Sequence, residues 1–400
     1  MLNVWFQLLL HLGVASSAFV DLLAKKEVDF NWIEVGSINA EAFSYNNNWV
    51  KVTTRNKFDG DPLVFLSVPD VADILNAPWY PQARGPSLIP PIVPKVEELP
   101  VQNPDGTYSF QFKLVTVNDS FCSKEWYDAF YVPPGQSFIE IAWLMAQAGA
   151  YGLSGVYDDD PRNLNFVISS GNITRASASP TATSSNGNAI QMFYPTGCIN
   201  ASELCIVNEF SMGLQQLQTS RNTVDNGKDL FLSVRAWSIL KRSAWFVLVP
   251  HDSVNSTYFE ISTPEVLAYM IVPTNQVIVC SEGFVVETRT FDDVTHVPVP
   301  LSFAMTYDYI PAIFGMLGSV FSMVDSTTLS VYNTSQSSAV FITKEDQCVS
   351  EPIVHTTPEI VHMLIIAQSR SASMEALTVC KIDYEPPPQE EECVSVIQKQ

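Results

Sequence analysis

Three glutamates recur at one position of a repeated phrase and are the first candidates for chemistry. The phrase covers residues 357–366, returns closely at 263–272 and more loosely at 137–146, and aligns Glu359, Glu265 and Glu140. Paired carboxylates act as acid and base in glycoside hydrolysis. Here each glutamate belongs to its own copy, and no second carboxylate is placed beside it. The pattern favours a residue at a strand start or a structural hydrogen bond, with a secreted hydrolase as an alternative.

The histidines form no catalytic or zinc-binding pattern. Beyond the N-terminal segment they are His251, His296, His355 and His362. The sequence holds no His-Glu-x-x-His motif. His355 and His362 are seven residues apart, a spacing that places them neither within one turn of a helix nor on the same face of a strand. It also lacks the Gly-x-Ser-x-Gly turn of serine hydrolases. We therefore predict no catalytic residue and no enzymatic activity.

Two acidic turns and two aromatic pairs remain as binding candidates. Asp158–Asp160 and the segment from Asp225 to Asp229 offer oxygen ligands, although neither matches an EF-hand loop. We predict no cofactor and no metal site, with Ca²⁺ left open. Trp79-Tyr80 and Trp126-Tyr127 could stack on sugar rings, although packing in a core is the favoured role.

The N-terminus predicts export. An apolar run over Val4–Val14 is followed by the small residues Ala15–Ala18, which is the pattern of a secretory signal peptide cut after Ser17 or Ala18. The sequence also contains five Asn-x-Ser/Thr sites for N-glycosylation, at Asn118, Asn172, Asn200, Asn255 and Asn333. Each predicts a surface loop if it is glycosylated.

The cysteines agree with an oxidising compartment. They are Cys122, Cys198, Cys205, Cys280, Cys348, Cys380 and Cys393. Cysteines of an exported protein are mostly paired. Cys198 and Cys205 are close enough to close a small loop, and Cys280 with Cys380 could tie the ends of the last repeat together. Because seven is odd, one cysteine is left over, and Cys393 is the expected free or intermolecular thiol.

Charge excludes two classes of partner. The chain of 400 residues carries 42 acidic against 21 basic side chains, a formal charge of −21. A phosphate backbone needs a basic face, so we predict no nucleic-acid partner, and anionic lipid headgroups are excluded by the same argument.

No stretch after the signal peptide is apolar enough to predict a membrane span. The expected location is extracellular or at the cell surface.

The repeated phrase indicates how the chain is organised. Self-similarity at long spacing predicts related units in series. The segments before the phrase are also alike, since Val247 precedes Glu265 by 18 positions and Phe341 precedes Glu359 by 18. In the first copy, 130–132 is the expected counterpart of these segments. Thr-Pro-Glu could begin a helix, but the β-branched residues that follow favour a strand.

The predicted fold is all-β, with tandem antiparallel β-sandwich units and long loops. The predicted boundaries are a signal peptide at 1–18, unit 1 at 28–150, unit 2 at 152–273, unit 3 at 277–384 and an acidic tail at 385–400. Eight prolines between residues 77 and 104 predict an insertion over the surface of unit 1.

Units 1 and 3 resemble the H-type lectin domain. In unit 3 the resemblance rests on Phe291, Val297–Val299, Ile310–Gly315, Leu329–Val331 and the strand at Phe341, and in unit 1 on Trp49–Val52, Phe58 and Asp61–Phe65. The resemblance implies a six-stranded antiparallel β-sandwich that commonly trimerises and binds galactose-type sugars. A homo-oligomer and glycan or glycoprotein partners follow as expectations.

The combined expectation is a secreted or cell-surface glycoprotein with internal repeats that acts in binding or adhesion, with carbohydrate recognition as one form of that activity. A structural coat or extracellular-matrix protein without a small ligand is the first alternative. The secreted hydrolase is the second.

Overall fold

The described part of the chain consists almost entirely of antiparallel β-sheet. The computed structural model describes residues 33–41, 49–58, 60–78, 86, 89, 91–116, 138–153, 164–173, 190–193, 211–221, 223–224, 228–229, 232–239, 243–250, 263–279, 284–319, 327–345, 355–368 and 377–378. The prediction of an all-β fold with tandem antiparallel sandwich units is confirmed.

The strands fall into three groups, which we call units 1, 2 and 3. Unit 1 contains β1 (Ile33–Glu41), β2 (Val50–Thr53), β3 (Pro62–Leu66), the short helix α2 (Ala72–Asn76), β4 (Ile92–Val96), β5 (Val101–Gln102), β6 (Tyr108–Thr116) and β7 (Phe138–Gln147). Unit 2 contains β8 (Gly149–Leu153), β9 (Leu164–Ile173), β10 (Ile190–Phe193), β11 (Ser211–Leu217), β12 (Thr223–Val224), β13 (Lys228–Asp229), β14 (Leu232–Ile239), β15 (Ser243–Pro250) and β16 (Glu265–Pro273). Unit 3 contains β17 (Val277–Val279), β18 (Phe284–Val294), β19 (Val299–Ser302), β20 (Ala312–Leu317), β21 (Thr327–Tyr332), β22 (Ser338–Glu345) and β23 (Glu359–Gln368), and β24 (Leu377–Thr378) follows it.

Six strands follow the same route in every unit. The first, third and sixth form one sheet, in the orders β1-β7-β3, β9-β16-β11 and β18-β23-β20. The second, fourth and fifth form the other, in the orders β2-β6-β4, β10-β15-β14 and β19-β22-β21. Because sheet membership and strand order agree in all three, the chain repeats one six-stranded sandwich three times.

Each unit receives a further edge strand from the segment that follows the preceding unit. β8 comes directly after β7 and pairs with β9, and β17 comes after β16 and pairs with β18. β24, which comes after β23, returns to the first unit and pairs with β1. The exchange therefore runs from unit 1 to unit 2, from unit 2 to unit 3 and from unit 3 back to unit 1, and it closes a ring.

The repeated phrase forms β7, β16 and β23, each of which is the central strand among the first, third and sixth strands of its unit. The structure thus settles the choice between helix and strand in favour of the strand. These strands are buried on both faces, which explains why their apolar residues run continuously rather than alternating. Leu144, Met270 and Leu364 point into one central cluster shared by all three units. Trp143 and Tyr269 point the other way, into the separate cores of their own sandwiches.

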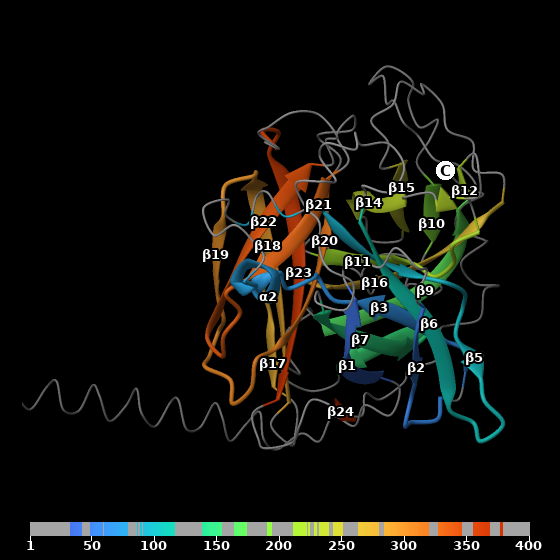
Figure 1. Ribbon diagram of the computed structural model, residues 1–400. Helices are drawn as coiled ribbons and strands as arrows, with labels where there is room; N and C mark the ends of the chain where they lie inside the picture. The colour runs from blue at the N-terminus through green and yellow to red at the C-terminus, as the bar shows by residue number, and fades with distance from the viewer. Residues whose placement is uncertain are drawn as a thin grey trace, which may run out of the picture.

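The central cluster gives the ring an approximate threefold axis. Buried residues from the first, third and sixth strands of every unit contribute to it. The sheets that contain the first, third and sixth strands therefore pack around this axis, and the sheets that contain the second, fourth and fifth strands lie outside them. In Figure 1 the orange and red strands of unit 3 lie beside the blue strands of unit 1 and the green strands of unit 2.

Two expectations about unit 1 need correction. The sequence analysis placed the unit 1 counterpart of β15 and β22 at residues 130–132, which lie outside the described residues. In the structure β6 is that counterpart, since it is the middle strand of its sheet as β15 and β22 are of theirs. The predicted proline-rich insertion at 77–104 also contains β4, the fourth strand of the sandwich. Pro94 is tolerated there because β4 is an edge strand, where a missing backbone N–H disrupts no ladder.

Candidate functional site

A cavity of about 130 Å³ lies where the third strands of the three units end. Its wall includes Leu66–Pro69 of unit 1, Gln215–Leu217 of unit 2 and Gly315–Leu317 of unit 3. These segments are equivalent, because the residue just before each one pairs with the same position of its central strand. Residues of β4, β14 and β21 also line the cavity. Equivalent segments from all three units thus surround it, which places the cavity on the approximate threefold axis.

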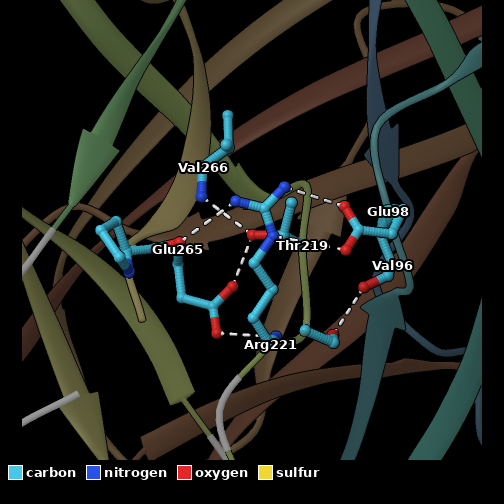
Figure 2. Close-up of polar contacts among 8 residues, drawn as sticks. Val96, Glu98, Thr219, Arg221, Glu265 and Val266 are labelled. Atoms are coloured by element: carbon cyan, nitrogen blue, oxygen red, sulfur yellow. Dashed lines mark hydrogen bonds and ion pairs between the residues drawn. The ribbon is translucent and has the colours of Figure 1, made fainter. Parts of the chain in front are cut away.

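The junction between units 1 and 2 contains a buried carboxylate beside this cavity. Figure 2 shows Glu265 at the start of β16, where Oε2 accepts a hydrogen bond from Thr219 Oγ1 and Oε1 accepts one from the Arg221 backbone N–H at 3.0 Å. Thr219 Oγ1 in turn accepts the Val266 N–H at 2.9 Å. The carboxylate is therefore engaged on both oxygens, and it fixes the loop after β11 against the start of β16.

The same loop reaches across to unit 1. Arg221 Nη2 forms an exposed ion pair with Glu98 Oε2 at 3.0 Å, as Figure 2 also shows. Ser220 Oγ donates to the Val96 carbonyl at 2.6 Å.

The Gln218 amide bonds both backbone groups of Val64, accepting from its N–H at 2.9 Å and donating to its carbonyl at 2.7 Å. Gln218 therefore satisfies the open edge of β3 as a neighbouring strand would.

The junction between units 2 and 3 repeats this arrangement with a different charge partner. Ser319 Oγ donates to Glu359 and accepts the Ile360 N–H at 2.7 Å, as Thr219 does with Glu265 and Val266. Arg235 Nη1 of β14 lies 3.2 Å from Glu359 Oε1, and both side chains are fully buried. A buried guanidinium from unit 2 thus contacts the carboxylate of unit 3.

The junction between units 3 and 1 is made by backbone. Val71 N donates to the Val331 carbonyl at 2.9 Å, and Val331 N donates to the Pro69 carbonyl at 3.1 Å. Val71 holds the same place in its unit as Ser220, so the loops after the third strand of units 1 and 2 dock on a neighbouring unit in the same cyclic sense. A buried lysine lies at this junction as well, since Lys344 Nζ donates to the Ile89 carbonyl at 3.3 Å. Burial lowers the pKa of Lys344 to about 7.

Glu140 does not hold the position of the other two glutamates. Leu144, Met270 and Leu364 all face the central cluster, and Glu265 and Glu359 each lie five residues before the member of this set on their own strand, so the equivalent residue of β7 is Ile139. Side chains alternate between faces of a strand, and a slip of one residue turns them to the opposite face. Glu140 is accordingly exposed, while Glu265 and Glu359 are buried. The predicted equivalence of the three is therefore wrong for Glu140.

Two histidines lie inside the protein at separate places. His362, on β23, faces the central cluster, and its Nδ1 lies 3.2 Å from the Gly213 carbonyl of unit 2. Burial lowers the pKa of His362 to about 4. His355 is also fully buried, with Nδ1 3.2 Å from Thr327 Oγ1 and Nε2 4.0 Å from Glu359 Oε1. Within the described residues no group of three or more His, Cys, Asp or Glu side chains could hold a metal ion.

A second kind of buried carboxylate escaped the sequence analysis. Glu34 on β1 and Glu287 on β18 hold equivalent places, and each accepts a backbone N–H from the loop after the second strand of its unit. The donors, Arg55 and Ala304, both lie 2.9 Å away. A glutamate in an inward position of an alternating strand is the sequence signal that could have found them.

The remaining predicted sites are only partly described. Asn172, in β9, and Asn333, in the turn after β21, have exposed side chains. Asn118, Asn200 and Asn255 lie outside the described residues, as do all seven cysteines, Asp158–Asp160 and both aromatic pairs. Of the acidic turn at 225–229, only its last two residues are described, as β13. In the described parts of the chain, no helix is long and apolar enough to cross a membrane.

Searches of protein-family models, curated proteins and solved structures found no match to this chain.

Proposed function

We propose that the protein is an exported glycoprotein that acts in binding or adhesion, and that carbohydrate is its ligand class. The observation that carries the proposal is the closed ring of three equivalent six-stranded sandwiches. The H-type lectin domain that units 1 and 3 resemble is a six-stranded sandwich that commonly trimerises, and this chain contains three such units in one polypeptide. The signal-peptide pattern, the sequons and the cysteines support export.

The ring gives a physical reason for a binding role. Three equivalent units on a shared core present their outer sheets in fixed relative positions. When several weak sites are held together, a second contact becomes intramolecular, and avidity rises by about 10²–10⁴ without any stronger site. This arrangement suits ligands that are repeated on a surface, such as the glycans of other glycoproteins.

A glycan array with the mature full-length chain tests the proposal. The expected result is binding to a galactose-type sugar that increases steeply between low and high immobilised density. A repeat with a calcium chelator determines whether Ca²⁺ takes part. Absence of binding at high density would remove the lectin proposal and leave a structural coat or matrix role.

The hydrolase alternative has its own test. If the chain releases sugar from any arrayed glycan, Glu265→Gln and Glu359→Gln are compared with Glu140→Gln as the exposed control. Loss of turnover in a buried variant that still gives a cooperative unfolding transition, with turnover kept in the control, would assign the activity to that glutamate.

A further inference from the structure

We propose that Asn172 carries an N-linked glycan whose role is to cover an open strand edge of unit 2, so that this edge does not pair with a second copy of the chain. This role rests on the proposed export of the protein, because only an exported chain is N-glycosylated. Three observations support it: Asn172 lies in a strand, its backbone groups face away from the sheet, and that strand has no charged residue.

Asn172 lies within β9, whereas its sequon predicted a surface loop. It pairs with Val266 of β16. The backbone of Val266 faces the other way, since its carbonyl accepts the Gln218 N–H at 2.8 Å and its N–H donates to Thr219 Oγ1 at 2.9 Å. Two residues paired directly across an antiparallel ladder face each other or both face away. The backbone N–H and C=O of Asn172 therefore point away from β16, as do those of Ser170 two positions before.

This outer edge of β9 is open at its C-terminal end. β8 pairs with β9 only as far as Ile168. In the described part of the chain, no strand pairs with the outer side of residues 169–173. The side chains of Ser170 and Asn172 are both exposed, so nothing covers them. An exposed edge of this kind is a template for pairing with a strand of another molecule.

The equivalent edges of units 1 and 3 have protection that β9 lacks. In unit 3 a β-bulge that contains the exposed residues Asp292 and Asp293 interrupts the ladder at this point. In unit 1 the equivalent residue is Asn39, which pairs with the exposed Glu140, and Glu41 ends the strand. Bulges and charges both discourage edge pairing. The ten residues of β9 include no charged side chain, and its pairing with β16 is regular.

A glycan on Asn172 supplies the missing protection. The sequon is Asn172-Ile173-Thr174. In the modification, the Asn172 amide nitrogen forms a bond to the anomeric carbon of an oligosaccharide, the bond from that carbon to a lipid diphosphate breaks, and one amide proton is released. The attached glycan is bulky and hydrophilic. Because it is joined beside the outward backbone groups of Ser170 and Asn172, it excludes a second strand from them.

Peptide mass mapping of the five sequons tests the modification, with the full chain secreted from a eukaryotic cell. We expect Asn172 to be occupied. Glycans at other sequons with none at Asn172 would overturn the role assigned to Asn172 and leave the proposed exported glycoprotein standing. No glycan at any sequon would overturn both.

Two substitutions at Asn172 test the role of the glycan. Asn172→Gln and Asn172→Lys both remove it, but only the lysine places a charge at the edge. In sedimentation velocity, Asn172→Gln should associate about tenfold or more strongly than the unmodified chain, because strand pairing is gained. Asn172→Lys should behave as the unmodified chain does. Deuterium uptake of the peptide Leu164–Ile173 should be slower in the associated Asn172→Gln chain, which locates the contact at β9.

Equal association of the two variants would overturn the proposal, as would association without slower uptake at β9. Thr174→Ala and Thr174→Ser decide the question if Asn172→Gln does not fold, because both keep Asn172 and only Thr174→Ser keeps the sequon. Association is expected in Thr174→Ala alone. The same behaviour in both variants would contradict a role for the glycan.

Discussion

The Arg235 guanidinium lies 3.2 Å from the Glu359 carboxylate, and neither side chain is exposed. Arg235 comes from β14 of unit 2 and Glu359 begins β23 of unit 3. The pair therefore joins two consecutive units through residues that lie 124 positions apart in the sequence, at a place where water is excluded. An ion pair also joins units 1 and 2, Arg221 with Glu98, but it comes from other positions of the units and is exposed. The two junctions therefore allow a buried ion pair to be compared with an exposed one.

Glu359→Gln should destabilise the protein by about 3–5 kcal/mol, because it leaves the Arg235 charge buried without its carboxylate. Glu98→Gln should cost less than about 1 kcal/mol, because solvent screens the exposed pair. The free energy of unfolding from urea titration measures both. A similar cost for the two variants would contradict the assigned burial of the Arg235–Glu359 pair.

Glu265→Gln should cost about 1–3 kcal/mol, since it weakens the bonds from Thr219 and from the Arg221 backbone N–H. Glu140→Gln should change stability by less than about 0.5 kcal/mol, because that side chain is exposed. Thermal unfolding of the two variants provides the check. A larger effect at Glu140 would restore the equivalence of the three glutamates that the strand register rejects.

The glutamates show what sequence alone could and could not predict. Repetition of the phrase identified three related units, and β-branched residues identified its copies as strands. The prediction for Glu140 was one residue out of register because the loose copy of the phrase was aligned with the other two by residue type. Only pairing with the third strand fixes which side chains share a face.

The sequence predicted less of the candidate site than of the fold. Gln215, Gln218 and Arg235 act across units, and their partners lie far along the chain, at Leu317, Val64 and Glu359. No periodicity in the sequence contains that information, because it depends on how the three sandwiches meet. The pairing of β24 with β1, which closes the ring, could not be predicted for the same reason.

Lys344→Met should stabilise the protein at neutral pH. The pKa of Lys344 is lowered from 10.5 to about 7, so the folded state disfavours the charged form. The stability linked to its neutral form is complete above about pH 10.5 and is lost as the pH falls through about 7. The gain in Tm from the substitution should therefore be larger at pH 6 than at pH 9.

Lys113→Met is the matched control for Lys344→Met. Lys113 lies on β6, the counterpart of β22, but its Nζ sits 4.5 Å from the centre of the Trp49 ring. Loss of that cation–π contact should lower Tm or leave it unchanged. A Tm gain for Lys344→Met that does not vary with pH would show that burial of charge is not its cause.

His362→Gln should flatten the dependence of stability on pH. The pKa of His362 is lowered from 6.5 to about 4, so its neutral form is favoured in the folded protein. The stability that this group contributes is present above about pH 6.5 and is lost as the pH falls towards 4, by about 3 kcal/mol in all. Denaturant titrations at pH 7 and pH 5 compare the variant with the unmodified chain and with His296→Gln, a half-buried control. Equal slopes in all three would contradict the placement of His362 in the central cluster.

Removal of β24 should expose the outer edge of β1. A chain that ends at Ala376 lacks this strand, whereas a chain that ends at Val379 keeps it, and both lack Cys380. An unpaired edge strand exchanges its amide hydrogens faster and invites association between copies. Deuterium uptake of the peptide covering Ile33–Glu41 should therefore be faster in the shorter chain, while uptake of Phe284–Val294, which β17 covers, should be the same in both. Identical uptake at β1 would mean that the ring is held by its core and its junctions, without a contribution from the third strand exchange.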